Sequence, residues 1–143
     1  MSAGDRVEIP DDALAFLVAT KTPGILATVG RSGGPVTSAV WYAADRRAVF
    51  VSTPDAGTKA SNVRGDDRVS FIVDARERPY CGVAIEGSAT LLDDPNLERW
   101  SAIARRYLGE DLPEEFLQRA RSRPRAIIEL RPRRVRSWNL EPA

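Results

Sequence analysis

The chain has 143 residues, a formal net charge of +1, one cysteine and no histidine. This length fits a single domain with its own core, so we expect one domain over residues 1–143. A net charge near zero gives no general attraction to nucleic acid, and we predict no nucleic-acid partner. The absence of histidine excludes Ser-His-Asp and Cys-His catalysis and any imidazole-ligated metal site, so we predict no metal.

Cysteine usage and hydropathy bear on the compartment. The single cysteine, Cys81, cannot form a disulfide within the chain, which fits a reducing environment. No apolar run approaches the roughly 18 residues of a membrane span, and the N-terminal residues lack a signal-peptide pattern. We therefore expect a cytoplasmic protein without a membrane span.

The first half of the chain predicts a helix followed by an antiparallel meander. Residues 10–19 have helical apolar spacing, with Asp11 and Asp12 in the first turn, where they complement the helix dipole. Strands are predicted over residues 25–29, 35–42 and 48–53. A Gly-rich turn joins the first two strands, and Asp45-Arg46-Arg47 joins the second and third.

The second half predicts more strands and two further helices. Strands are predicted over residues 68–74 and 80–92, and a last strand over 125–130 and 134–140, either interrupted at Pro132 or divided in two. Gly82 and Gly87 inside the long strand predict a bulge or bend. One helix is predicted to begin at an Asp94 cap and run to Gly109, and a shorter one to follow Pro113. About six antiparallel strands with few short helices indicate a mainly β (α+β) chain forming a small barrel.

One segment carries the parts of a phosphate site. The strand end Val51-Ser52-Thr53 is followed by a Pro/Gly loop and then a short helix for which Thr58 is the predicted N-cap. Lys59 and Asn62 are three residues apart and so lie on one helical face. A helix N-terminus favours anions, and a lysine, an amide and two hydroxyls would add to it. Spacing alone also fits the polar face of an ordinary surface helix.

Several short motifs, in this order, resemble the split β-barrel flavin-binding family of pyridoxamine-phosphate oxidase and the coenzyme F420-dependent reductases. They are Ile25-Leu26-Ala27-Thr28-Val29, Pro35-Val36-Thr37-Ser38-Ala39-Val40-Trp41, Val51-Ser52-Thr53, Lys59-x-x-Asn62, Asp67-Arg68-Val69-Ser70, Ile85-Glu86-Gly87-Ser88-Ala89 and Pro132-x-x-Val135-x-Ser137-Trp138. The resemblance covers about residues 10–139 and is greatest to the short F420-dependent branch.

The resemblance implies a split six-stranded barrel that forms a homodimer, with cofactor bound in grooves at the subunit interface. It further implies that the strand end (Val51, Ser52 and Thr53), Lys59 and Asn62 hold the cofactor phosphate. The backbone of Thr37, Ser38 and Ala39 would lie along the ring system. Many F420-binding relatives have an arginine just before the lysine, whereas this chain has Gly57-Thr58; Arg64, one helical turn beyond Lys59, could substitute.

The function that this resemblance implies is an F420-dependent oxidoreductase, passing a hydride from reduced deazaflavin to an unsaturated or quinone-like organic acceptor. No catalytic residue is predicted; the acceptor's proton would come from water or a hydroxyl such as Tyr42 or Tyr80. Two alternatives stay open: an FMN-binding oxidase or flavin reductase of the same fold, and a non-catalytic protein that holds a cofactor or heme. The arginine-rich segment over residues 119–136 is interpreted as solvated surface with salt bridges to the acidic residues 110–115, or as a positive rim for the F420 tail.

Overall fold

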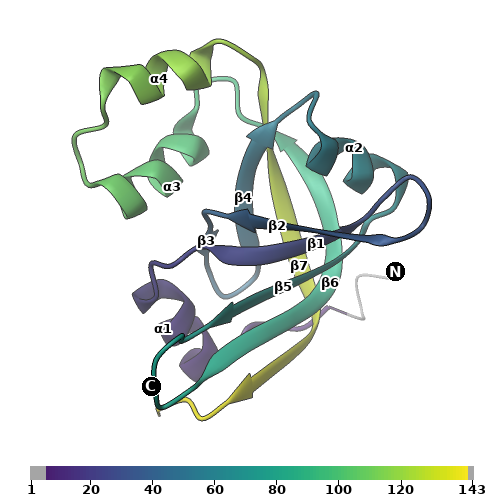
Figure 1. The fold of residues 1–143 in the computed structure, drawn as a ribbon, viewed down its shortest axis with the longest axis vertical. Coiled ribbons are helices and arrows are strands. Elements are labelled where there is room, and N and C mark those ends of the chain that lie inside the picture. Colours follow the sequence, from purple (N-terminus) through teal and green to yellow (C-terminus); the bar gives the residue numbers. More distant parts are fainter. Residues whose placement is uncertain (1–5, 142–143) are drawn as a thin grey trace.

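The computed structural model describes residues 6–141, which form one antiparallel sheet curled into a half-barrel, together with helices (Figure 1). In chain order the described elements are α1 (Asp11–Ala19), β1 (Gly24–Val29), β2 (Pro35–Val40), β3 (Ala43–Ala44), β4 (Val49–Pro54), α2 (Thr58–Gly65), β5 (Arg68–Asp74), β6 (Gly82–Asp93), α3 (Glu98–Leu108), α4 (Glu114–Arg121) and β7 (Arg125–Trp138). The strands lie in the order β2-β1-β5-β6-β7-β4-β3. The predicted split-barrel architecture is confirmed, with the two-residue β3 as an additional edge strand.

The last strand is one long strand, as in the first of the two predictions, but without the predicted interruption at Pro132. β7 runs through Pro132, and its pairing with β6 shifts register between Glu86 and Gly87: Glu86 pairs with Arg134 and Gly87 with Pro132, so Arg133 has no partner position. A Cβ on Gly87 would lie 2.1 Å from the Arg131 carbonyl oxygen, and this backbone approach explains why a glycine stands there. The predicted bulge is confirmed.

Two predicted helix starts were wrong. Helix α2 begins at Thr58 itself, its N-cap is Gly57, and no side chain caps it. Helix α3 begins at Glu98, four residues after Asp94. The Asp94 carboxylate nevertheless accepts hydrogen bonds from the backbone N–H groups of Arg99 and Trp100, at 3.1 and 2.9 Å, and so satisfies donors of the first turn that a helix leaves free.

Three apolar clusters hold these elements together. The first fills the inside of the curled sheet under α1 and α2, the second lies between the sheet and α3, and the third lies between α3 and α4. Trp41 packs against both the second and the third cluster. Its ring stacks on Tyr107 of α3 at 5.0 Å and on Phe116 of α4 at 6.3 Å between centroids. The helical pair is therefore fixed against the segment that follows β2.

A buried junction joins α1, α3 and the segment between β2 and β3. Tyr42 is fully buried, and its hydroxyl lies 2.7 Å from the Leu17 carbonyl oxygen and 2.8 Å from that of Thr20. The Arg106 guanidinium donates to the carbonyls of Leu17, Val18, Thr20 and Tyr42 and lies over the Tyr42 ring. Arg106 thus satisfies carbonyls at the end of α1 that the helix cannot pair itself.

Strand β2 has a larger share of exposed residues than the other strands of the described sheet. It is an edge strand, and four of its six residues are exposed, including Val36 at 39%. Ile72 of β5 is also exposed, at 37%, but on the opposite face of the sheet from Val36. Within residues 6–141, no helix has both the length and the apolar composition that crossing a membrane would require.

Candidate functional site

A hollow beside the end of β2 brings together three of the predicted site residues. It has a volume of about 320 Å³ and is formed by the ends of β2 and β4, the first turn of α2, the inner face of α3 and the start of β7. Its lining residues are Ala39, Val40, Trp41, Ser52, Pro54, Lys59, Trp100, Ile103, Ala104 and Arg125. We call this the Lys59 hollow.

The Lys59 hollow is positively charged. Lys59 and Arg125 are the charged residues in its lining, and the lining contains no carboxylate. Arg125 Nε donates a hydrogen bond to Ser52 Oγ at 3.0 Å. Burial lowers the pKa of Arg125, and the neighbouring charge of Arg123 lowers it further. Two cations and a hydroxyl around a small half-buried space suit an anion such as a phosphate.

A second hollow lies on the other side of α2, against the tip of the β1–β2 hairpin. It has a volume of about 1090 Å³ and is lined by hairpin residues, the loop before α2, and Thr58, Ser61 and Asn62 of α2. Asn62 Nδ2 donates to Thr28 Oγ1 at 3.0 Å, which ties α2 to β1. Arg68 in this lining is paired with Asp66 at 2.6 Å, and this partner lowers the pKa of Asp66 to about 2. The charges of this hairpin hollow are therefore partly balanced.

The other predicted site residues are placed differently. Ser52 and Thr53 are neighbours on a strand, so their side chains point to opposite faces of the sheet: Ser52 lines the Lys59 hollow, whereas Thr53 is buried and its Oγ1 has no hydrogen-bond partner among the described residues. Val51 belongs to the core cluster inside the sheet. Arg64 is held by Asp55, donating to both its carboxylate and its carbonyl oxygen, and lines neither hollow.

Thr37 and Ser38 lie on β2, between the two hollows. Thr37 is exposed and Ser38 half-buried, and β2 pairs along one edge with β1. The other edge carries no strand in the described sheet, because β2 stands first in its order. Unpaired backbone N–H and C=O groups are therefore open at this edge to another molecule.

Sequence reasoning missed Arg125 and the aromatic wall of the Lys59 hollow. Arg125 pairs with Pro54 across the β4–β7 ladder, two positions from Ser52 on the same face. Only the strand order and register reveal this neighbour, since 73 residues separate Arg125 from Ser52. Trp100 comes from α3, whose helical spacing was visible in the sequence but whose packing with Trp41 was not.

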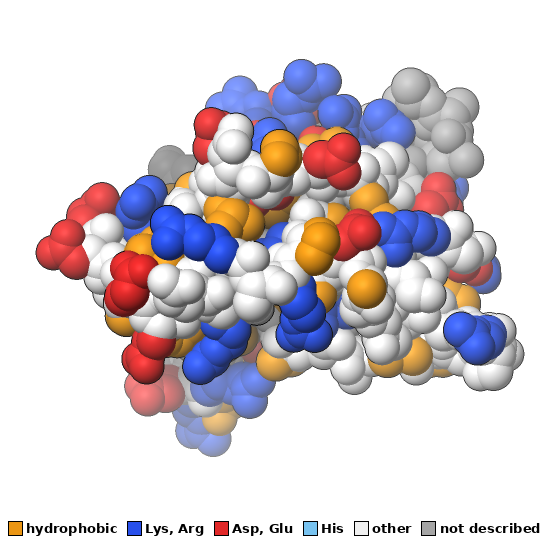
Figure 2. All heavy atoms as spheres, turned by 90° about the horizontal axis from the view of Figure 1, so that it is seen from above, with side chains coloured by type: hydrophobic (Ala, Val, Ile, Leu, Met, Phe, Trp, Pro, Cys, Tyr) orange, Lys and Arg blue, Asp and Glu red, His pale blue; other side chains and the backbone are white. Residues whose placement is uncertain are grey.

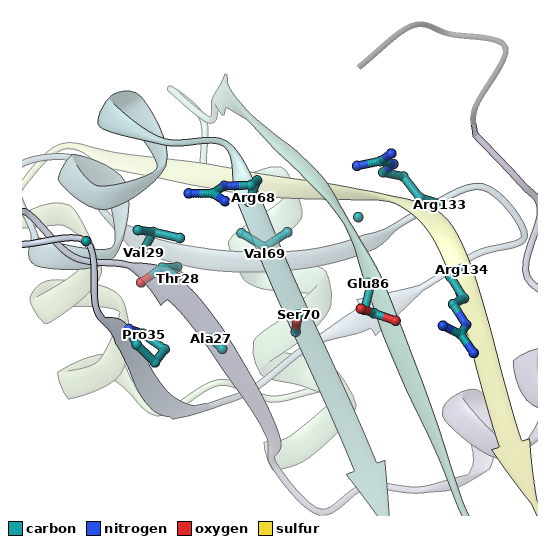
Figure 3. A pocket seen from close by; sticks show the side chains of 12 residues that line it. Ala27, Thr28, Val29, Pro35, Arg68, Val69, Ser70, Glu86, Arg133 and Arg134 are labelled. Carbon is teal, nitrogen blue, oxygen red and sulfur yellow. The ribbon is translucent and has the colours of Figure 1, made fainter.

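The outer face of the sheet carries a third, open hollow of about 760 Å³. Figure 3 shows Ser70, Glu86 and Arg134 in one row across β5, β6 and β7, as their pairing positions require. The row continues through Ala27 of β1 to Thr37 of β2. This face therefore presents small and polar side chains in an ordered cross-strand pattern rather than a closed pocket.

Neither Tyr42 nor Tyr80, the two residues suggested as proton donors, is suited to donate a proton to the acceptor. Burial raises the pKa of Tyr42 to about 12, and its hydroxyl is committed to main-chain carbonyls. Tyr80 is 55% exposed and lines neither the Lys59 hollow nor the hairpin hollow. Over residues 6–141, no three His, Cys, Asp or Glu side chains gather where they could hold a metal ion.

The arginine-rich segment has mixed surroundings. Arg121 pairs with Glu114 at 3.8 Å, and Arg131 pairs with Glu129 at 3.2 Å. Figure 2 shows the end of the molecule seen from above in Figure 1, where basic and acidic side chains are interspersed with apolar ones. This mixture of charges fits a solvated surface better than a continuous basic patch.

Comparisons with known proteins agree with this architecture. A family model described as pyridoxamine 5'-phosphate oxidase matches residues 10–139. A conserved hypothetical protein from Mycobacterium tuberculosis shares 30% identity, with 97% of this chain and 89% of that chain covered and a TM-score of 0.77.

Two more distant structures share the fold alone. An F420 reductase is 24% identical, with 90% of this chain and 98% of that chain covered and a TM-score of 0.75. A heme-binding protein from Mycobacterium smegmatis is 20% identical, with 94% of this chain and 58% of that chain covered and a TM-score of 0.65. Because the family model spans nearly all of the described residues, this chain belongs to the pyridoxamine 5'-phosphate oxidase-like split-barrel family.

Proposed function

We propose that this protein is an F420-dependent reductase that passes a hydride from the reduced deazaflavin to an unsaturated or quinone-like organic acceptor. The observation that carries the proposal is the Lys59 hollow, where two cations and a serine hydroxyl without a lining carboxylate open beside the exposed strand β2. The similarity in fold to an F420 reductase supports this choice of cofactor.

The residues present fit the phosphate of such a cofactor. Lys59 has no ion-pair partner within 4.0 Å among the described residues, and Ser52 Oγ accepts from Arg125, which leaves the serine O–H free to donate. Ala39 connects the hollow to β2, along which the backbone of Thr37 and Ser38 would lie against the ring system. Asn62 would contribute from the hairpin side of α2, if it left Thr28. Val51, Thr53 and Arg64 would support the site from the core and the loop.

When bound, the deazaflavin supplies the hydride. The work of the protein is then to hold the phosphate, to keep one face of the ring open, and to exclude competing reactions. No side chain is assigned to acid–base catalysis, because Tyr42 is buried in the core and burial raises its pKa to about 12. The acceptor's proton is therefore assigned to water.

The functional unit that we propose is a homodimer with the cofactor at the interface. On the outer sheet face, Ile72 of β5 is 37% exposed, and the small side chains of Ala27 and Ala39 lie on this same face, so a second copy could approach closely. Val36 of the edge strand β2 is 39% exposed on the opposite face. A partner on the outer face would cover the open edge of β2 and close the groove along it.

Parallel fluorescence titrations with F420, FMN and heme test the cofactor choice. We expect F420 to bind more tightly than FMN and reduced F420 to be oxidised when quinone or enone acceptors are added. A protein that purifies yellow and prefers FMN would establish the flavin alternative. Tight binding without turnover across a broad acceptor screen would instead identify a cofactor carrier, and preferential binding of heme would overturn the proposal.

A further inference from the structure

Arg125 occupies an unusual position for an arginine. It stands at the start of β7, is only partly exposed, and reaches across the ladder to Ser52 of β4 through its Nε at 3.0 Å. This single bond uses one of the five N–H donors of the guanidinium. No other hydrogen bond and no ion pair within 4.0 Å involves the Arg125 side chain among the residues that the structure describes.

The charge of Arg125 is left without a close counter-ion. Asp94 is the carboxylate near enough to favour the charged form, yet its oxygens accept from the backbone N–H groups of Arg99 and Trp100. Arg123 lies close enough to disfavour that charge, and burial lowers the pKa in the same direction. A half-buried cation beside a second cation raises the free energy of the site unless an anion enters.

Lys59 is the other cation in the lining of the Lys59 hollow. Lys59 belongs to the first turn of α2, whereas Arg125 belongs to β7, so two separate elements place their charges around one space of about 320 Å³. A planar guanidinium presents paired donors that match two oxygens of a phosphate, while an ammonium acts as a point charge. Trp41 and Trp100 are the aromatic residues of the lining.

We propose that Arg125 is a ligand-binding residue, and that it grips a phosphate ester jointly with Lys59 and the Ser52 hydroxyl. The inference rests on the proposed function, since the phosphate is that of the bound cofactor, and it adds the residue that makes the grip selective for a phosphorylated form. Ser52 then has two roles: its oxygen orients Arg125, and its hydrogen donates to the anion.

The test compares cofactors that differ by the phosphate. FMN and riboflavin form the pair that differs by the phosphate alone. F420 and its deazaflavin precursor, which lacks the phosphate together with the anionic tail attached through it, form a second pair. Affinities are measured by fluorescence titration for the parent protein, Arg125→Met, Arg125→Lys and the control Arg47→Met. Arg47 is an exposed arginine in the turn before β4, so the control removes the same charge away from the hollow. Circular dichroism and thermal unfolding establish that each variant is folded.

We expect Arg125→Met to weaken binding of the phosphorylated form at least tenfold and to change binding of the phosphate-free form less than twofold. Arg125→Lys should recover part of the loss, and Arg47→Met should behave as the parent. Equal losses for both forms would show a merely structural role and overturn the inference, as would an unchanged affinity for the phosphorylated form. Either result would leave the proposed function standing if the parent still binds F420.

A separate arm isolates the hollow if the parent binds no flavin or deazaflavin, a result that would defeat the proposed function. Inorganic phosphate is then titrated into the parent, Arg125→Lys and Arg125→Met while phosphorus NMR line widths are followed. Broadening by the parent that is lost in Arg125→Met supports an anion site at Arg125. Identical line widths for parent and variants contradict it.

Discussion

Replacing Lys59 by methionine removes one positive charge from the Lys59 hollow and keeps most of the apolar stem. Lys59 lies in the first turn of α2 and is half-buried, and the described residues provide no ion-pair partner within 4.0 Å. The folded state should therefore lose little from Lys59→Met. The bound state should lose a charge-assisted hydrogen bond to phosphate.

The magnitude follows from the strength of such a bond. Hydrogen bonds to charged groups contribute about 1.5–3 kcal/mol, and about 1.4 kcal/mol corresponds to a tenfold change in affinity. Lys59→Met should thus weaken F420 binding roughly ten- to a hundred-fold. Because Arg125 shares the same anion, the losses in a double variant should not add.

The assay is a fluorescence titration with F420 and with its phosphate-free form, using Lys21→Met as the matched control. Lys21 is the only other lysine of the chain and is exposed in the loop after α1. The control should bind F420 as the parent does. An unchanged F420 affinity in Lys59→Met, or an equal loss for the phosphate-free form, would refute the assignment of Lys59 to the phosphate.

Three further variants test the junction, its pH dependence and the interface. Arg106→Met removes the donor to four carbonyl oxygens and should lower the free energy of unfolding, measured by urea titration, by about 2–4 kcal/mol. A loss below about 1 kcal/mol would contradict this. The raised pKa of Tyr42, about 12 against 10.0, means that the unfolded state releases its proton first as pH rises. The contribution of Tyr42 is complete below pH 10 and is lost as pH rises toward 12, by roughly 1 kcal/mol at pH 11, and Tyr42→Phe should lack that loss. Ile72→Lys should convert the proposed dimer to monomer in sedimentation experiments and weaken F420 binding; a dimer of unchanged affinity would argue against this interface.

The strands were predictable because their side chains alternate between core and solvent. Strand β5 was placed at its observed bounds, and the glycines of β6 correctly indicated a bulge. The same two-residue period also implied that Ser52 and Thr53 could not both face one ligand, because neighbours on a strand point to opposite faces. The alternation of side chains along β4 thus indicated that only one of the two hydroxyls could reach a ligand.

The rest of the site depends on long-range pairing. Arg125 reaches Ser52 only because β7 lies beside β4, a neighbourhood that local patterns do not encode. The start of α3 was placed three residues early because Asp94 accepts hydrogen bonds from Arg99 and Trp100 of the first turn without being the residue adjacent to the helix. Strand β2 alternated well in sequence but is exposed on both faces at the edge of the sheet.

A crystal structure of the protein with F420 bound tests the central claim most directly. We expect the deazaflavin ring along β2 and the phosphate within hydrogen-bonding distance of Lys59 Nζ, the Arg125 guanidinium and Ser52 Oγ. A second copy of the chain should cover the ring from the outer sheet face. A phosphate seated in the hairpin hollow, or elsewhere on the surface with the Lys59 hollow left to water, would contradict the account.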